Sequence, residues 1–317
     1  MNDYEKILLI VGTIILGVFV ISLMLAVITY FVVFKRMKTA SIYNMSEKFF
    51  MYKYKDELIK GHKWYDALPK DIYKITNDRG IELIGRHTIN PNNKNKNVIL
   101  YSHGYRSEGC YDITCMGSSM LYDQGYDIFV IDQEAHGASS GKYTTFGLRD
   151  SDNILLWVDK INEIYQDDCN IILFGDSMGA NTVMLTADKP MKNVKMIIAD
   201  CGFSSAYEEL KYSVAKKYKL GMLVFKLFQF VSKLFGINIK EKDARITLKS
   251  SKYPVLFIHG TADPIVPSYM SEECYEACTS EKDIILFEGI GHALSGILEK
   301  EKYQEKVLEF INKYLER

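Results

Sequence analysis

The sequence predicts an α/β fold with a mostly parallel central sheet, helices on both faces of the sheet, a helical cap and one apolar helix at the N-terminus. Three observations in the 317-residue chain lead to this prediction. Short apolar runs alternate with helix-period segments from residue 71 onward, which is typical of parallel strands buried on both faces. Residues 7–34 contain no charged side chain, and a Gly-x-Ser-x-Gly turn follows one of the apolar runs.

Residues 7–34 form the first predicted element, an apolar helix of roughly 40 Å that exceeds the ~30 Å hydrocarbon core of a bilayer. We expect it to cross a cell membrane once, so that residues 1–38 comprise an anchor and its basic flank. The alternative is a cleaved signal peptide. The length of the apolar run and the lack of a small-x-small site after it disfavour that alternative.

Positive charges flank the predicted span unequally. Lys6 and the terminal amine precede it, whereas six lysine and arginine residues follow it within residues 35–55. The positive-inside rule therefore predicts that the C-terminal domain lies on the cytoplasmic face. Residues 39–69 are expected to form a helical juxtamembrane spacer, with a charged helix at residues 41–60.

Residues 70–317 are predicted to form one α/β domain. Its first part, residues 71–89, alternates apolar and polar residues around a turn at residues 77–80, as a hairpin does. Ligands of parallel α/β sheets bind beyond the carboxyl ends of the strands, so the residues that end each run matter most. The predicted central strands begin the segments 97–105, 127–137, 170–179, 194–202, 254–263 and 283–292.

One segment interrupts this alternation. Residues 204–249 contain no convincing strand, and residues 220–237 within them are helical and strongly apolar. Lys226 and Lys233 in that stretch argue against a second membrane span. We therefore expect residues 204–249 to form a helical cap over the strand ends.

The segment "NIILFGDSMGA" places Ser177 directly after a buried strand and before a helix-period segment. A serine in such a tight strand-to-helix turn stands clear of the sheet, where it can attack a substrate carbonyl. Side chains two positions before and after it would clash with the passing backbone. Gly175 and Gly179 remove those side chains, so the pattern predicts a nucleophile elbow.

A serine nucleophile needs a base and an acid that orients the base. His292 follows the last predicted strand in "GIGHA" and lies after an acidic residue, which gives the chain order Ser, Asp, His that this arrangement requires. We expect Asp263, in "HGTADPIVP", to be the acid. Asp200, at the end of the preceding strand, is the alternative acid.

The developing oxyanion requires two backbone N–H donors. One is expected from Met178, the residue after the nucleophile, at the N-terminal end of a helix. The other is expected from the loop after "VILYSHGY", where Gly104 permits a tight turn and the amide of Tyr105 is our choice.

Composition narrows the range of partners. The formal net charge is -1, so the chain as a whole has no broad positive field and we expect no nucleic-acid partner. The six cysteines form no CxxC pair and no His/Cys cluster with zinc spacing, so we expect neither a metal nor a cofactor. The sequence gives no indication of the oligomeric state.

With these motifs in order, the chain resembles the α/β-hydrolase superfamily, in particular its bacterial membrane-anchored branch of serine aminopeptidase-like and monoacylglycerol-lipase-like hydrolases. The resemblance covers about residues 70–315 and implies metal-free hydrolysis through an acyl-enzyme. Relatives usually carry arginine where Gln133 or Glu134 stands here. The matching segments are "SHGY" (102–105), "DQEAHGASSGKYTTFG" (132–147), "GDSMGA" (175–180), "DCGFSSAY" (200–207), "HGTADPIVP" (259–267) and "GIGHA" (289–293).

Three functions are compatible with these residues. The first is a membrane-anchored serine hydrolase that cleaves carboxylic esters, with acyl-glycerols or lysolipids as substrates suggested by the anchor and the apolar cap. The second is an aminopeptidase or amidase that uses the same triad on peptide substrates. The third is an inactive, hydrolase-like membrane scaffold, which the presence of all three triad residues argues against.

Overall fold

The structure is a computed structural model of the chain and describes residues 2–37, 42–47, 49–107, 118–218 and 220–315. Eight strands form one sheet in the order β1-β2-β4-β3-β5-β6-β7-β8. β2 pairs antiparallel with β1 and β4, and the other neighbours are parallel, which confirms the mostly parallel sheet and the hairpin. The strands are β1 (Asp71–Thr76), β2 (Glu82–Thr88), β3 (Asn97–Ser102), β4 (Asp127–Asp132), β5 (Asn170–Asp176), β6 (Val194–Asp200), β7 (Val255–Gly260) and β8 (Lys282–Phe287).

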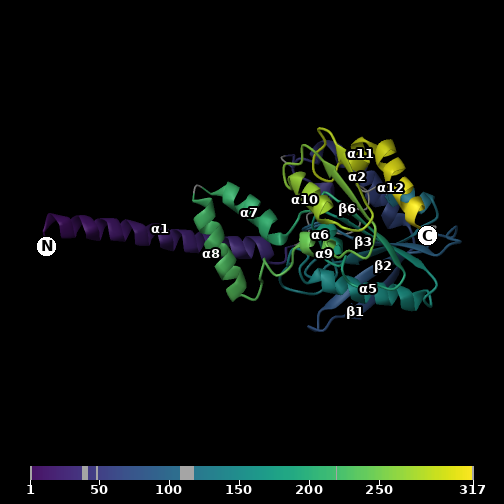
Figure 1. Ribbon diagram of the computed structural model, residues 1–317, viewed down its shortest axis with the longest axis horizontal. Coiled ribbons are helices and arrows are strands. Elements are labelled where there is room, and N and C mark those ends of the chain that lie inside the picture. Colours follow the sequence, from purple (N-terminus) through teal and green to yellow (C-terminus); the bar gives the residue numbers. More distant parts are fainter. Residues whose placement is uncertain (1, 38–41, 48, 108–117, 219, 316–317) are drawn as a thin grey trace.

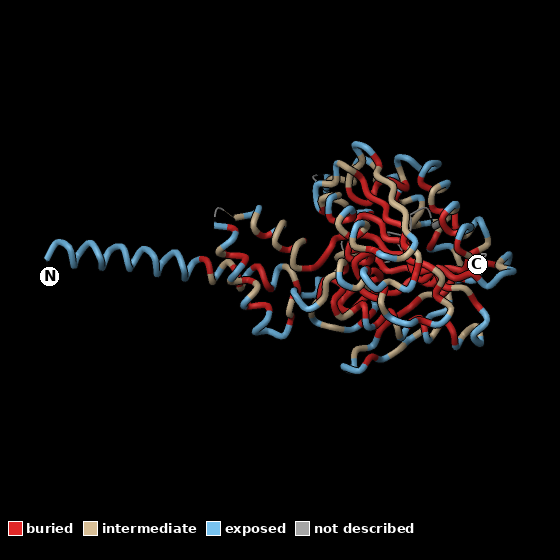
Figure 2. The backbone as a smooth tube through the Cα atoms, viewed as in Figure 1, coloured by how far each residue is buried: buried red, intermediate tan, exposed pale blue. Residues whose placement is uncertain are grey.

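Alternate strand residues face two apolar cores, one on each side of the sheet. In β3, Val98 and Leu100 face one core, and Ile99 and Tyr101 face the other. Figure 2 shows the buried backbone concentrated in this central layer. The first core is covered by α5 (Asp150–Ile164), α6 (Met178–Met184), α9 (Ala244–Leu248) and α10 (Tyr269–Ala277). The second is covered by α2 (Lys55–Ala67), α4 (Ser118–Asp123), α11 (Ser295–Leu298) and α12 (Lys300–Leu315).

The predicted helical cap lies between β6 and β7. Its helices are α7 (Ala206–Lys217), α8 (Gly221–Leu234) and the short α9. α8 buries Val224, Phe225 and Phe228 on one side. In Figure 1, α7 and α8 stand beside the sheet domain, and α8 lies across the N-terminal helix.

The N-terminal helix α1 (Asp3–Phe34) has two different halves. Residues 2–21 are all exposed, and an 18-residue window of the helix has a mean hydropathy of 2.9, which makes α1 a candidate membrane span. Asn2 and Glu5 form a capping box that holds its first turn. The second half packs against the cap and the domain through Ser22, Ala26, Thr29, Tyr30 and Phe34.

The predicted spacer at residues 39–69 is less regular than expected. It contains the 3-10 turns η1 (Ile42–Asn44) and η2 (Tyr52–Tyr54), and its α-helix α2 begins at Lys55 instead of residue 41. Ser46 lies between these turns, and serine is unfavourable inside a helix because its side chain can hydrogen-bond the backbone in other conformations. α2 then packs on the sheet domain through Leu58 and Tyr65.

Candidate active site

Ser177 lies in the sharp turn that joins β5 to α6. Its backbone φ is 50° and its ψ is −113°, a region that costs a non-glycine residue on the order of 1–3 kcal/mol. The side chain is buried to 8% exposure. A conformation this unfavourable, held between a buried strand and a buried helix, is typical of a functional position.

The two glycines around Ser177 are required by close backbone contacts. A Cβ on Gly175 would lie 2.3 Å from the carbonyl of Gly179, and a Cβ on Gly179 would lie 1.9 Å from the oxygen of Ser102. Real Cβ atoms do not approach this closely. Neither backbone can move away, since Gly175 belongs to the central strand β5 and Ser102 to the neighbouring strand β3.

The structure brings together the three residues that the sequence selected from distant segments. His292 Nε2 lies 3.0 Å from Ser177 Oγ, and His292 Nδ1 lies 2.5 Å from Asp263 Oδ2. The ring can therefore donate its Nδ1–H to the carboxylate and accept the serine proton at Nε2. This is the geometry that general-base activation of a serine needs.

Asp263 is held ionised by its surroundings. It also accepts hydrogen bonds from the His259 ring (3.2 Å) and from the amides of Ile265 (2.8 Å) and Val266 (2.9 Å). Burial alone would raise the pKa of Asp263, but the hydrogen bonds from His259 and His292 hold it well below its usual range. His259 is in turn fixed by the Ser271 hydroxyl at 2.7 Å.

Asp200, the alternative acid, has a different partner. Its Oδ2 accepts a hydrogen bond of 2.8 Å from the hydroxyl of Tyr303 in α12. Burial raises the pKa of Asp200 to about 6, and the Tyr303 bond lowers it only in part. The geometry therefore favours Asp263 as the residue that orients His292.

The two amides expected to form the oxyanion hole are free of backbone acceptors within the described residues. Met178 is the first residue of α6, where the N–H groups have no carbonyl partner in the helix. Tyr105 follows β3 in the loop that passes the same end of the sheet. Both amides are thus available to a developing negative charge.

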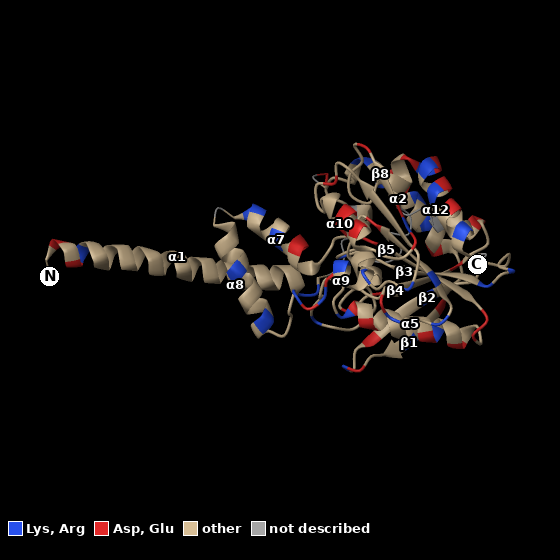
Figure 3. Ribbon diagram, in the orientation of Figure 1, with Lys and Arg blue, Asp and Glu red and all other residues tan. Residues whose placement is uncertain are grey.

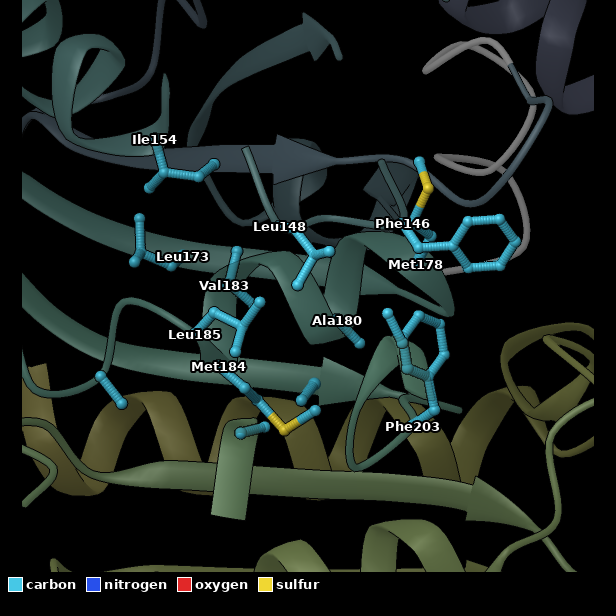
Figure 4. Close-up of a cluster of buried hydrophobic side chains, with 14 of the residues drawn as sticks. Phe146, Leu148, Ile154, Leu173, Met178, Ala180, Val183, Met184, Leu185 and Phe203 are labelled. Atoms are coloured by element: carbon cyan, nitrogen blue, oxygen red, sulfur yellow. The ribbon is translucent and has the colours of Figure 1, made fainter. Parts of the chain in front are cut away.

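Buried aromatic side chains form one apolar wall near the N-terminal end of α6. The Phe146 ring lies 4.7 Å from the Tyr105 ring and 6.2 Å from the Phe203 ring, measured between centroids. Figure 4 shows Phe146, Met178 and Phe203 gathered at the end of α6 that Ser177 precedes. Phe34 of α1 reaches the same wall, at 6.1 Å from Phe146.

Glu209 in α7 is a residue that the sequence analysis missed. Its side chain is buried, Oε1 accepts a 2.7 Å hydrogen bond from Ser213, and Oε2 has no partner within the described chain. Burial raises the pKa of Glu209 to about 7. Its charge also acts on His292, so it belongs to the surroundings of the site. In the sequence it is one of two adjacent acidic residues on a helix that also carries three lysines.

We expect the charge of Glu209 to shift the pH dependence of the site. Burial lowers the pKa of His292, but Asp263 and, more weakly, Glu209 raise it above its ordinary value. Because His292 must be neutral to act as base, kcat/KM should rise with pH through that raised pKa. Glu209→Gln should therefore move this limb to lower pH. Glu208→Gln changes the half-buried neighbour that pairs with Lys211, and it should leave the limb in place. Equal profiles for both variants would contradict the assignment.

The end of α1 is bonded to the loop that carries Tyr105. The Tyr105 hydroxyl donates to the carbonyl of Val33 (2.6 Å), and the Arg106 guanidinium donates to the carbonyl of Val32. The Arg106 amide donates to His136 Nε2 at 3.1 Å. Burial lowers the pKa of His136 to about 3, which keeps that ring neutral and able to accept. The free carbonyls of the helix end thus hold the proposed oxyanion loop.

Tyr105→Phe tests this coupling, because it removes the bond to Val33 and keeps the backbone amide. The lost hydrogen bond should cost about 1 kcal/mol in the positioning of the Tyr105 amide. This loss should lower kcat roughly fivefold, with a smaller change in KM. Tyr143→Phe is the control. The Tyr143 ring also packs on α1, at 5.8 Å from the Tyr30 ring, but within the described residues its hydroxyl makes no hydrogen bond to this loop. Steady-state kinetics on a soluble ester would measure both. The same loss in both variants would mean a general packing effect.

Within the described residues, no group of three or more His, Cys, Asp or Glu side chains is placed to hold a metal ion. The buried cysteines Cys274 and Cys278 lie at one end of α10, and burial raises the pKa of the Cys274 thiol. Cys201 lies nearer the site, with Sγ 4.0 Å from His292 Nε2, and burial raises its pKa well above the ordinary value. The raised pKa values keep the Cys201 and Cys274 thiols protonated, which makes them poor nucleophiles.

Comparison with known proteins agrees with this fold. The profile of the serine aminopeptidase family S33 matches residues 93–235. YqkD of Bacillus subtilis (strain 168) is 26% identical over 318 aligned positions that cover 97% of this chain and 97% of YqkD.

Two solved structures show the same fold. Pyrococcus furiosus esterase Pf2001 has a TM-score of 0.62 and 23% identity, over 78% of this chain and 93% of its own. Est1E from Butyrivibrio proteoclasticus, solved with ferulic acid bound, has a TM-score of 0.59 and 21% identity, over 77% of this chain and 100% of its own. The chain therefore shares the fold of these two proteins, and over residues 93–235 it is similar to the serine aminopeptidase family S33.

Proposed function

We propose that the chain is a membrane-anchored serine hydrolase that cleaves carboxylic esters through an acyl-enzyme. The observation that carries this proposal is the hydrogen-bonded series Ser177, His292 and Asp263 at the carboxyl end of a parallel sheet. The reaction would begin when Ser177 Oγ attacks the ester carbonyl while its proton passes to His292 Nε2. The amides of Met178 and Tyr105 would receive the negative oxygen.

The second half of the reaction uses the same groups in reverse. His292 would return its proton to the leaving alcohol, and the acyl group would remain on Ser177 until water enters. Water would then attack the acyl carbon while His292 takes its proton. The bond from that carbon to Ser177 Oγ would break as His292 passes the proton to Oγ, which releases the carboxylic acid and free Ser177. Asp263 stays ionised throughout and keeps the ring in the required tautomer.

Acyl esters are the substrates that the surroundings favour. The aromatic wall formed by Phe34, Phe146 and Phe203 is buried, and it makes the interior around Met178, the residue after the serine, apolar. The similar structure Pf2001 is an esterase by name, and Est1E was solved with ferulic acid bound. Acyl-glycerol or lysolipid-like esters fit both features, because their acyl chains are apolar and they reside in the membrane that α1 would anchor the protein to.

We propose that α1 anchors the protein in the cell membrane by a single pass through residues 7–34, with the hydrolase domain on the cytoplasmic face. The packing of its second half against the domain supports an anchor that is kept, because a cleaved signal peptide would leave this contact surface open. The basic residues after the helix support the orientation.

The experiment is a substrate series on the purified full-length protein in detergent. We expect p-nitrophenyl esters to be hydrolysed with an optimum in acyl-chain length between acetyl and palmitoyl, and faster than peptide p-nitroanilides. The chain-length optimum would give the size of the acyl site. No hydrolysis of any ester by the folded protein would contradict the proposal and favour the inactive scaffold.

A second function, aminopeptidase or amidase activity on the same triad, is favoured by one observation. The buried carboxyl of Glu209, with an unpartnered oxygen, could pair with the amine of a peptide substrate. Faster turnover of aminoacyl p-nitroanilides than of esters, lost selectively in Glu209→Gln, would support this function. Retained ester turnover in the same variant would separate substrate recognition from catalysis.

A further inference from the structure

The outer face of the cap helix α8 carries large exposed apolar side chains. Met222, Phe230 and Leu234, spaced four or eight residues apart, lie on one stripe with 48%, 65% and 71% exposure, and Phe235 just beyond the helix is 55% exposed. The opposite face of α8 is buried against the rest of the protein. We call Met222, Phe230, Leu234 and Phe235, together with Lys226 and Lys233 between them, the cap patch.

The cap patch is continuous with the apolar surface of α1. The Phe235 ring lies 5.0 Å from the ring of Tyr30 and 6.4 Å from that of Phe31. Phe31 is itself 40% exposed, and Ile28, one turn earlier, is 53% exposed. Whatever solvent surrounds this part of α1 therefore also reaches the cap patch.

α8 lies across α1 and not along it (Figure 1). Tyr218, just before α8, hydrogen-bonds Thr29 at 2.9 Å, and Phe235, just after α8, contacts the adjacent Tyr30. If α8 ran parallel to α1, its two ends would contact residues that lie far apart along α1. If α1 follows the bilayer normal, α8 lies in the plane of the membrane.

The depth of α8 follows from the length of α1. About 20 residues cross the ~30 Å hydrocarbon core, and the acidic and basic residues Asp3, Glu5 and Lys6 hold the far end of α1 at the opposite surface. The core then extends to about residue 26. Residues 29–34 of α1, with α8 against them, come to lie at the headgroup level on the side of the hydrolase domain.

The charge of the cap suits this position. Between Leu210 and Lys240 the sequence contains seven lysines and no acidic residue, although the whole chain has a net charge of -1. Figure 3 shows lysines of α7 and α8 on the outer surface of the cap. Lysines beside an apolar face are typical of helices that lie in an anionic membrane interface, where they attract the lipid phosphates.

From these observations we propose that the cap patch docks on the surface of an anionic lipid bilayer, with the apolar side chains at the level of the acyl boundary and Lys226 and Lys233 at lipid phosphates. This inference rests on the proposed membrane anchoring of α1. It makes the cap a second membrane contact, which holds the site of Ser177 close to lipid esters.

The depth of residue 230 tests the proposal directly. Full-length Phe230→Trp would be reconstituted into phosphatidylcholine vesicles with phosphatidylglycerol, made with or without brominated acyl chains. We expect strong quenching beyond that of wild type, which supplies the background from Trp64 and Trp157. The matched control is Ile246→Trp, since Ile246 of α9 is 67% exposed outside the cap patch. Equal quenching at both positions would overturn the proposal, as would burial of residue 230 in a dimer.

A charge reversal tests the role of the lysines. Lys226→Glu combined with Lys233→Glu should lower hydrolysis of a long-chain ester held in anionic vesicles at least roughly fivefold and leave p-nitrophenyl acetate hydrolysis unchanged. The control pair Lys300→Glu and Lys302→Glu reverses two lysines of α12 and should change neither rate. Unchanged vesicle hydrolysis would overturn the role of the lysines. If wild type hydrolyses neither ester, the proposed function fails, whereas the quenching experiment still decides the membrane contact.

Discussion

Ser177→Ala is expected to abolish ester hydrolysis, with kcat lowered by on the order of 10⁶, the loss seen when a triad serine is removed. The reason is that Oγ is the atom 3.0 Å from His292 Nε2 and no other described hydroxyl occupies that place. The fold should remain, because alanine keeps the Cβ and removes only one oxygen. Circular dichroism and thermal unfolding would establish the fold, and turnover of a p-nitrophenyl ester would measure kcat.

The control for this variant is Cys201→Ala. Cys201 is the other nucleophilic side chain beside His292, with Sγ at 4.0 Å, but burial keeps its thiol protonated. We expect Cys201→Ala to retain most of the activity. If activity survives in Ser177→Ala and is lost in Cys201→Ala, the nucleophile has been assigned to the wrong residue.

The second large effect is expected for Asp263→Asn, a loss of about 10⁴ in kcat. An asparagine amide at this place would donate to His292 Nδ1, so that Nε2 would carry the proton and could not accept one from Ser177. The substitution keeps the size of the side chain, and the amides of Ile265 and Val266 can still bond the remaining oxygen. The kcat of the folded variant on a soluble ester measures the effect.

Asp200→Asn is the matched variant for this prediction. Asp200 accepts a hydrogen bond from the Tyr303 hydroxyl and, within the described residues, makes no hydrogen bond to His292. Its replacement should therefore change kcat by less than about tenfold. A loss of 10⁴ in Asp200→Asn, with a mild effect in Asp263→Asn, would show that the sixth strand supplies the acid. The two variants together decide between the alternatives that the sequence left open.

The part of the site that the sequence predicted depends on local patterns. Gly175, Ser177 and Gly179 form a short turn whose steric demands are visible in the sequence, and the clashes measured at both glycines give the physical reason. The strands could be predicted because each is a near-continuous apolar run, as burial on both faces requires. The order of Ser177, Asp263 and His292 along the chain then followed from the fold.

The rest depends on contacts between distant segments. Nothing in the sequence around Val33 shows that its carbonyl accepts a bond from Tyr105, more than seventy residues later. Glu209 resembles any exposed helical glutamate until the packing of α7 buries it. The helix expected at residues 41–60 was wrong in its first part, because two short 3-10 turns precede Lys55, where the regular helix begins.

The most direct test of the central claim is the site of covalent labelling by a fluorophosphonate. The full-length protein in detergent would be treated with the probe and digested, and the modified peptide would be identified by mass spectrometry. We predict a single adduct on Ser177, prevented by prior incubation with a hydrolysable ester and absent in Ser177→Ala. An adduct on another residue, or none on a folded protein that hydrolyses esters, would contradict the assignment of Ser177 as the nucleophile.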